Sequence, residues 1–258
     1  MARSKATDDR LMPTQLEGLL AVQAALEAGF RDLQQILIDE NKRYDRRLRE
    51  LRRSAEGAGV AVRFTARSTI DERASGESHG GIVAEAGDRR FCQLADLLLA
   101  KDAAFIVMLD GIEDPYNFAG AIRALYAAGV HGAVVRPRNW TSAAALVGRA
   151  SAGTIERLPL AVAESAADAA EFFRGRGLVI ACAASDDRSK SLYQTDLTRP
   201  LFLLIGGERR GVTRSFRRAA DLQLRIPYGR EFASALGAVS AASVIGFEVM
   251  RQRRCKST

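Results

Sequence analysis

A group of glycines follows an apolar segment near the C-terminus of the chain. Residues 201–205 (LFLLI) are all apolar, and Gly206, Gly207 and Gly211 come directly after them. An apolar strand that ends in glycines and leads into a helix lets backbone N–H groups approach a ligand closely, because glycine has no side chain in the way. Many α/β proteins contain such a turn, so this segment indicates a ligand site without identifying the ligand.

A second polar cluster follows another apolar segment. Residues 114–117 (DPYN) come after the apolar run at 104–109, and Arg123 lies six residues beyond Asn117. On a helix these two side chains do not stack directly, but a long arginine can reach back toward the first turn. A helix N-terminus beside an arginine suits a phosphate or a developing alkoxide. The alternative is structural: Asp114 or Asn117 caps the helix and Arg123 lies on the surface.

The charge balance favours a polyanionic partner. The chain of 258 residues has a net charge of +7, and 33 of its 38 basic residues are arginines. The planar guanidinium group matches phosphate oxygens, so a basic, arginine-rich protein indicates nucleic acid. A GC-rich coding sequence would also produce this composition, so charge alone leaves both explanations open.

Composition also excludes several classes of protein. The three cysteines are isolated, no CxxC pair exists, and the chain has two histidines, so we expect neither a disulfide framework nor a metal site. No apolar stretch approaches the roughly 18 residues that span a bilayer. The charged N-terminus is not followed by an apolar signal region. We therefore expect a cytoplasmic protein without membrane attachment.

The order of the predicted elements divides the chain into two α/β units. We expect residues 1–14 to be a disordered, charged tail, 15–90 a small α/β domain, 91–103 a linker with a connector helix, and 104–258 a larger domain. In the small domain we predict helices at 15–30 and 40–57, with strands at 34–38, 60–64 and 82–84. The connector helix is predicted at 93–100.

The larger domain alternates strands and helices, which is typical of a mainly parallel sheet covered on both faces. The predicted strands are 104–109, 132–136, 158–162, 178–182, 201–205 and 222–226. The predicted helices are 117–128, 141–151, 165–175, 212–219 and 234–252. A dinucleotide-binding fold is not supported because no GxGxxG follows the first strand, and GGERRGVT lacks the Lys-Ser/Thr of a P-loop.

Three segments in this order resemble the motifs of one family, the SpoU (TrmH-like) RNA methyltransferases of the SPOUT superfamily. They are LDGIEDPYNFAGAIRALYAAGVHGAVV, LLIGGERRGV and IPYGREFASALGAVSAASVIGFE. SAGTIERLPL between them also fits, and GLLAVQAAL and SGESHGGIVAE resemble parts of the small substrate-binding domain common in that family. The resemblance covers about residues 15–252.

The resemblance implies an α/β fold whose C-terminal segment forms a deep trefoil knot, which is a rare exception to the usual connection rules. It also implies that the knot builds a site for S-adenosylmethionine and that a homodimer completes the active site. The expected reaction is methylation of a ribose 2′-hydroxyl in structured rRNA or tRNA.

The resemblance also assigns roles to individual residues. Arg123 matches the arginine that activates the ribose hydroxyl, Asn117 the asparagine that positions the site, and Glu208 the glutamate of the second motif. The residues expected around the methyl donor are Ile205, Gly206, Gly207, Gly211, Ile226, Pro227 and Leu236. We expect Arg209, Arg210 and Arg214 to contact RNA phosphates, although a solvated helix face is the alternative.

The third motif departs from the family pattern. The family has Ser-Leu-Asn followed by Val-Ser, whereas residues 234–240 read SALGAVS, so Leu236 or Gly237 occupies the asparagine position. Ser234 matches the first serine and is expected to be catalytic, and Ser240 is a candidate for the second. A missing amide removes one orienting hydrogen bond, worth about 1–3 kcal/mol. The alternatives are therefore a catalytically weak RNA-binding or assembly factor that keeps the donor pocket, or methylation of a base.

Overall fold

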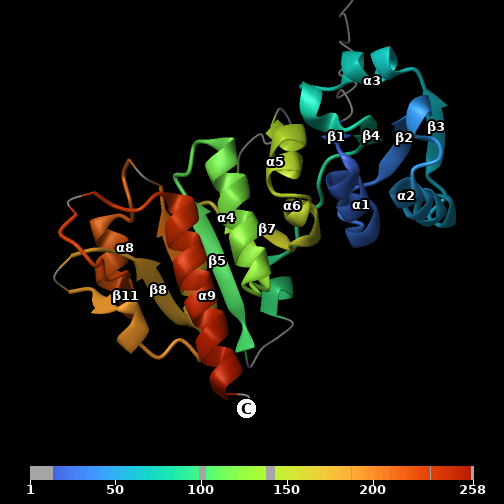
Figure 1. The fold of residues 1–258 in the computed structure, drawn as a ribbon. Coiled ribbons are helices and arrows are strands. Elements are labelled where there is room, and N and C mark those ends of the chain that lie inside the picture. The colour runs from blue at the N-terminus through green and yellow to red at the C-terminus, as the bar shows by residue number, and fades with distance from the viewer. Residues whose placement is uncertain are drawn as a thin grey trace, which may run out of the picture.

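The computed structural model describes residues 14–98, 103–137, 143–186, 188–207, 209–232 and 234–256. In these ranges the chain forms two α/β domains, built on a four-stranded and a seven-stranded sheet (Figure 1). The predicted tail lies outside the described residues except for Thr14, which already belongs to the first strand. None of the described helices is long and apolar enough to cross a membrane.

The N-terminal domain has a mixed sheet in the order β1-β4-β2-β3. β2 pairs in parallel with β3, whereas β4 runs antiparallel to both β1 and β2. Its elements are β1 (Thr14–Glu17), α1 (Leu19–Ala28), β2 (Leu33–Asp39), η1 (Glu40–Lys42), α2 (Arg46–Gly57), β3 (Ala61–Thr65), α3 (Arg67–Arg73), η2 (Glu77–His79) and β4 (Ile82–Ala86).

The predicted helix at 15–30 is wrong at its start. Thr14–Glu17 forms β1 and pairs with β4, and the helix begins only at Leu19. Gly18 separates them with a φ of 85°, which a helix cannot accommodate. The predicted helix at 40–57 is likewise divided, because the Asp45 carboxylate accepts a hydrogen bond from the Arg47 N–H and starts a new helix there.

The C-terminal domain contains the seven-stranded sheet, in the order β7-β6-β5-β10-β8-β11-β9, and every pairing in it is parallel. The expected α/β fold with a mainly parallel sheet is thus confirmed. Its strands are β5 (Phe105–Asp110), β6 (Gly132–Val135), β7 (Leu160–Val162), β8 (Val179–Ala183), β9 (Lys190–Ser191), β10 (Leu201–Gly206) and β11 (Leu222–Arg225).

The helices of this domain are α4 (Pro115–Ala127), α5 (Ala144–Ala150), α6 (Thr154–Arg157), α7 (Ala166–Arg174), α8 (Arg214–Ala219) and α9 (Ala238–Lys256), with 3-10 turns η3 (Leu94–Leu98) and η6 (Leu192–Gln194). The predicted connector helix is therefore a 3-10 turn over its described part. The last helix starts at Ala238 instead of the predicted 234, so Ser234 and Leu236 lie in the preceding loop.

Helices cover both faces of the large sheet, which explains the uninterrupted apolar strands. Phe105, Val107 and Leu109 of β5 share a buried cluster with residues of α4 and α9, and these two helices lie side by side on one face (Figure 1). Ile106 and Met108 point to the opposite cluster, which includes residues of α7 and α8. Because alternate residues both meet a helical layer, the strand has no polar face.

Strand β10 lies between β5 and β8, although both precede it in the chain. It pairs with β5 along its whole length, from Leu201 opposite Phe105 to Gly206 opposite Asp110. The two strands therefore end at the same level, and the turns that follow them meet. The trefoil knot implied by the sequence resemblance is not tested by strand order and stays a prediction.

The turns after β5 and β10 touch through their backbones. The Gly207 N–H donates to the Asp110 carbonyl at 2.8 Å, and a Cβ built on Gly207 would lie 1.9 Å from the carbonyl oxygen of Gly111. Real Cβ atoms do not approach backbone oxygens so closely, so position 207 requires glycine for close approach of two chain segments.

We expect Gly207→Ala to lower the free energy of unfolding by about 1–3 kcal/mol, the usual cost of overpacking, since the new methyl group must displace backbone. Urea denaturation would measure the free energy of unfolding. Gly229→Ala is the matched control, because nothing lies within 4 Å of a Cβ built there. Equal stability of the two variants would contradict the close contact.

Two cysteines differ sharply in their surroundings. Cys182 in β8 is buried, and burial raises the pKa of its thiol to about 12, whereas Cys255 near the end of α9 is exposed. Because the thiolate is the reactive form, Cys182 should resist alkylation. We expect iodoacetamide at pH 8 to modify Cys255 and leave Cys182 unmodified in the folded protein, as read by peptide mass spectrometry. Rapid labelling of Cys182 before unfolding would contradict this.

Candidate functional site

A cleft of about 610 Å³ lies at the carboxyl ends of β8, β10 and β11. Open parallel sheets bind ligands at this edge, because the loops leaving the strands can be built around a ligand without disturbing the sheet. The cleft volume falls within the range typical of small-molecule sites, about 300–1,000 Å³. A second depression of about 690 Å³ includes Val179 and Leu222, the first residues of β8 and β11, so it lies at the opposite edge of the sheet.

All the residues that the sequence assigned to a methyl donor line this cleft. They come from β10 and the turn after it, from the segment after β11, and from the loop before α9: Ile205, Gly206, Gly207, Gly211, Ile226, Pro227 and Leu236. Three segments separated by up to 31 positions (205 to 236) therefore converge on one space. Their role as donor-binding residues stays a prediction at this point.

The sequence suggested that the backbone N–H groups near Gly206, Gly207 and Gly211 approach a ligand, but two of these N–H groups donate within the protein. The Gly207 N–H donates to Asp110, and the Gly211 N–H donates to the Gly207 carbonyl at 2.8 Å. Both donors are therefore used within the protein. A Cβ built on Gly206 would lie 2.3 Å from the carbonyl carbon of Gly211, so the turn is folded directly against the strand end. Gly206 and Gly207 therefore permit close contact between chain segments, and the space that a side chain would take at either position is filled by backbone.

Two aromatic side chains on the cleft were not selected from the sequence. Tyr228 follows Pro227, and its hydroxyl accepts a hydrogen bond from the Leu236 N–H at 3.1 Å. The rings of Tyr228 and Phe232 meet edge to face, with centroids 5.8 Å apart. Both rings are well exposed, at 40% and 57% of their surface. The aromatic pair four residues apart beside Pro227 was the available signal. Tyr228 links the segment after β11 to the loop before α9.

The cleft is basic as well as apolar. Arg210, Arg217, Arg225 and Arg230 contribute to its lining, together with the apolar side chains of Ile205, Leu224 and Ile245. One Arg217 guanidinium nitrogen pairs with Asp186 at 2.7 Å, whereas its buried Nε has no hydrogen-bond partner within the ranges that the structure describes. The cleft thus combines apolar walls with cationic groups, which suits a flat heterocycle carrying polar or anionic substituents.

The three arginines predicted to contact RNA lie on the surface near this cleft. Arg209 has a side chain that is 87% exposed and pairs with Glu113 at 3.7 Å, a distance and exposure at which an ion pair contributes little. Arg210 is exposed and lines the cleft, and Arg214 is the exposed first residue of α8. All three are available to an outside partner.

The predicted catalytic residues are not gathered in the cleft. Asp114 caps α4, and its carboxylate accepts from the Asn117 N–H at 2.7 Å, so the capping alternative is correct for Asp114. Asn117 is half-buried and Arg123 exposed on α4, and neither side chain lines the cleft. Ser234 is exposed in the loop before α9. Glu208 lies outside the described residues.

Family models match both domains. The model described as the SpoU rRNA Methylase family matches residues 104–247, and the one described as RNA 2′-O ribose methyltransferase substrate binding matches residues 15–91. A Shewanella oneidensis protein named 23S rRNA (guanosine-2′-O-)-methyltransferase RlmB is 33% identical over 240 residues, which cover 92% of this chain and 96% of that protein. The Escherichia coli K12 protein of the same name is 31% identical over 245 residues, with coverage of 94% and 100%.

Solved structures show the same fold. The SpoU methyltransferase AviRb from Streptomyces viridochromogenes, in complex with the cofactor AdoMet, aligns with a TM-score of 0.76 at 24% identity and covers 98% of this chain and 94% of its own. An AdoMet-bound rRNA methyltransferase from Sinorhizobium meliloti gives 0.77 at 22% identity, with coverage of 96% and 90%. The resemblance of the motifs is confirmed, and the chain belongs to the SpoU rRNA methylase family.

Proposed function

We propose that this protein is an S-adenosylmethionine-dependent methyltransferase that modifies a ribose 2′-hydroxyl in ribosomal RNA. The observation that carries the proposal is the cleft, on which the second and third family motifs converge at the carboxyl edge of a parallel sheet. Family membership over both domains and the 23S rRNA activity named for full-length relatives support it. A cytoplasmic location follows from this substrate.

The cleft fits the methyl donor. Apolar Ile205, Leu224 and Ile226 offer a surface for a purine ring, and the backbone of Gly206 and Gly207 forms part of the same lining. When bound, S-adenosylmethionine supplies a methyl group already activated by its sulfonium. The protein therefore has to orient the two reactants and stabilise charge, which is a task for positioned polar groups.

Arg123 is the residue we propose for the acceptor side. A guanidinium group offers hydrogen-bond donors and no acceptor, so Arg123 would stabilise the developing negative charge on the ribose oxygen without acting as a base. The proton released from the hydroxyl must pass to another acceptor or to water. Asn117, six residues earlier on α4, would orient the ribose.

We also propose that the active form is a homodimer. Arg123 and Asn117 lie on α4 outside the cleft lining, so one chain presents the donor site and the acceptor residues on separate surfaces. α4 packs beside α9, and exposed aromatic side chains lie on both, at Tyr126 and Phe247. A second copy docked on these helices would bring its α4 to the cleft.

Arg123→Ala should reduce methyl transfer to ribosomal RNA by about 100- to 1,000-fold, the usual loss when one charge-stabilising group is removed. Labelled S-adenosylmethionine and RNA from cells that lack the protein would measure turnover, and nucleoside digestion would identify the methylated position. Donor affinity, measured by calorimetry, should stay the same.

Arg176→Ala is the control for this variant, because Arg176 lies just before β8, at the opposite edge of the sheet from the cleft. Unchanged turnover in Arg123→Ala would remove Arg123 from the mechanism. Donor binding by the unaltered protein without transfer to any RNA would favour the non-catalytic RNA-binding role, and label on a base would assign a different acceptor.

Removing Arg209, Arg210 and Arg214 together should weaken RNA binding and flatten its salt dependence. Each phosphate contact contributes about 0.7–0.9 to the slope of log K against log salt, so three contacts predict a slope reduced by roughly 2–3. Filter binding at several salt concentrations would measure it, with Arg176→Ala as the comparison. An unchanged slope would assign the three arginines to a solvated surface.

A further inference from the structure

The two domains are joined by an interface of small residues. Ala21 and Ala24 on α1 are fully buried, yet neither belongs to the apolar core of the N-terminal domain. They face the C-terminal domain instead: a Cβ built on Gly148 would lie 3.3 Å from the Cβ of Ala21, and one built on Gly153 would lie 2.4 Å from the Leu20 carbonyl oxygen. α1 therefore approaches α5 and α6 at backbone distance.

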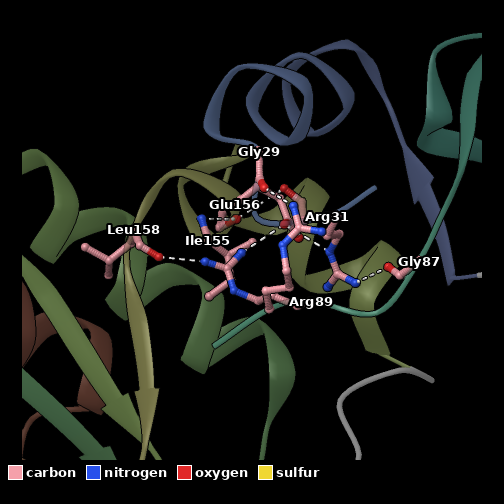
Figure 2. Close-up of polar contacts among 10 residues, drawn as sticks. Gly29, Arg31, Gly87, Arg89, Ile155, Glu156 and Leu158 are labelled. Atoms are coloured by element: carbon pink, nitrogen blue, oxygen red, sulfur yellow. Dashed lines mark hydrogen bonds and ion pairs between the residues drawn. The ribbon is translucent and has the colours of Figure 1, made fainter. Parts of the chain in front are cut away.

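A buried ion cluster crosses the same interface (Figure 2). Glu156 in α6 is 1% exposed and accepts hydrogen bonds from Arg31 Nε at 3.0 Å and from Arg89 Nη1 at 2.9 Å. Both arginines come from the N-terminal domain and have almost no exposed surface. One further nitrogen of each arginine donates to a carbonyl, Arg31 Nη1 to Gly87 of its own domain at 3.1 Å and Arg89 Nη2 to Leu158 of the other domain at 2.7 Å. The buried Nε of Arg89 has no hydrogen-bond partner among the described residues.

A second buried carboxylate crosses the interface in the opposite direction. Glu17 at the end of β1 is fully buried and pairs with Arg149 of α5. Its other oxygen accepts hydrogen bonds from the N–H and hydroxyl of Ser75, at 2.6 and 2.7 Å. Each domain thus supplies a buried carboxylate to arginines of the other, and the loop at Ser75 is attached to the same point.

Buried charges make this arrangement selective. Burial lowers the pKa of Arg89, and the Glu156 carboxylate offsets part of that cost. A buried ion whose partner is displaced is strongly destabilising, because its hydration has already been lost. Any other placement of the domains that kept Arg31 and Arg89 buried would leave them without Glu156. The interface therefore favours one relative orientation and penalises near alternatives.

We propose that Glu156 is a positioning residue for the RNA substrate. By binding Arg31 and Arg89 it fixes the substrate-binding domain against the methyltransferase domain, so that one RNA meets both as a single preformed surface. The inference rests on the proposed function. A preformed surface avoids the entropic cost of ordering two mobile domains on the RNA, and that saving appears in substrate affinity.

The first test is Glu156→Gln. It should raise KM for ribosomal RNA by about tenfold or more while kcat changes by less than about twofold, the pattern of lost uniform binding. The Kd for S-adenosylmethionine should not change, because the cleft is formed by other residues. Glu27→Gln is the matched control: Glu27 pairs with Arg157 across the same interface at 2.5 Å but is partly exposed, so its KM should stay near that of the unaltered protein.

Two results would overturn the proposal at this stage. An unchanged KM would show that Glu156 does not position the substrate. If KM rises while kcat, donor affinity and thermal stability all fall together, the residue serves folding alone.

The second test cross-links the domains through Ala21→Cys and Gly148→Cys, with Cys255→Ser to remove an exposed thiol. The 3.3 Å separation of the two Cβ positions is close to the roughly 3.5–4.5 Å found in disulfides. The oxidised, cross-linked protein should have the same KM and kcat as the unaltered protein. Introduced into Glu156→Gln, the same cross-link should bring the raised KM back to that of the unaltered protein. Loss of activity on oxidation and recovery on reduction would show that the domains must separate, which overturns the proposal.

Distances between spin labels on the two domains separate this inference from the proposed function. We expect a narrow distribution in the unaltered protein and a broad one in Glu156→Gln, whether or not methyl transfer occurs. Equal distributions would reject the positioning role. If the distances behave as expected but the unaltered protein methylates no RNA, the proposed function fails while the role of Glu156 in fixing the domains remains.

Discussion

The insertion of β10 between β5 and β8 is the constraint on which the rest of the C-terminal domain depends. Because β10 pairs in parallel on both edges, its carboxyl end emerges in the middle of the sheet, beside the end of β5. Gly207 then touches Gly111 through the backbone, and the chain must turn toward β8 and β11. That turn creates the cleft, and α9 closes the arrangement by packing on α4.

A second constraint is the charge buried between the domains. The small residues of α1 permit a close approach to α5 and α6, but apolar contact alone would tolerate sliding. Glu17 and Glu156 oppose such sliding, because each is a buried carboxylate of one domain that pairs with arginine of the other domain. Sliding would separate these buried charges from their partners. The sheets are held by strand pairing, which is parallel throughout in the C-terminal domain and mixed in the N-terminal domain. The orientation of the two domains depends instead on paired buried ions.

The sequence predicted six of the seven strands of the larger sheet, because strands buried on both faces are continuous apolar runs. It missed β9, which is two polar residues long and has no apolar pattern. The cleft lining was predicted from the resemblance of the second and third motifs to the family, and the residues so assigned do converge on one cleft. Sequence reasoning failed at 14–18, where pairing of β1 with β4 overrides a helical apolar pattern. It also gave no sign that Arg31, Arg89 and Glu156 meet, since residues 31 and 156 are 125 positions apart and each alone resembles a surface charge. Contacts set by tertiary structure leave no local pattern to read.

The separation of the cleft from Arg123 follows from how α9 begins. Ala238 lines the cleft, and the next residue, Val239, packs against α4, where a Cβ built on Gly120 would lie 3.1 Å from its side chain. The first turn of α9 therefore lies between α4 and the cleft. Arg123 is exposed to solvent one turn beyond Gly120 on α4. Arg123 is not among the residues that line the cleft, so the proposed acceptor residue and the donor site are not joined by a shared lining within one chain. The proposed second copy would connect them, so dimer formation and catalysis would be a single requirement of this topology.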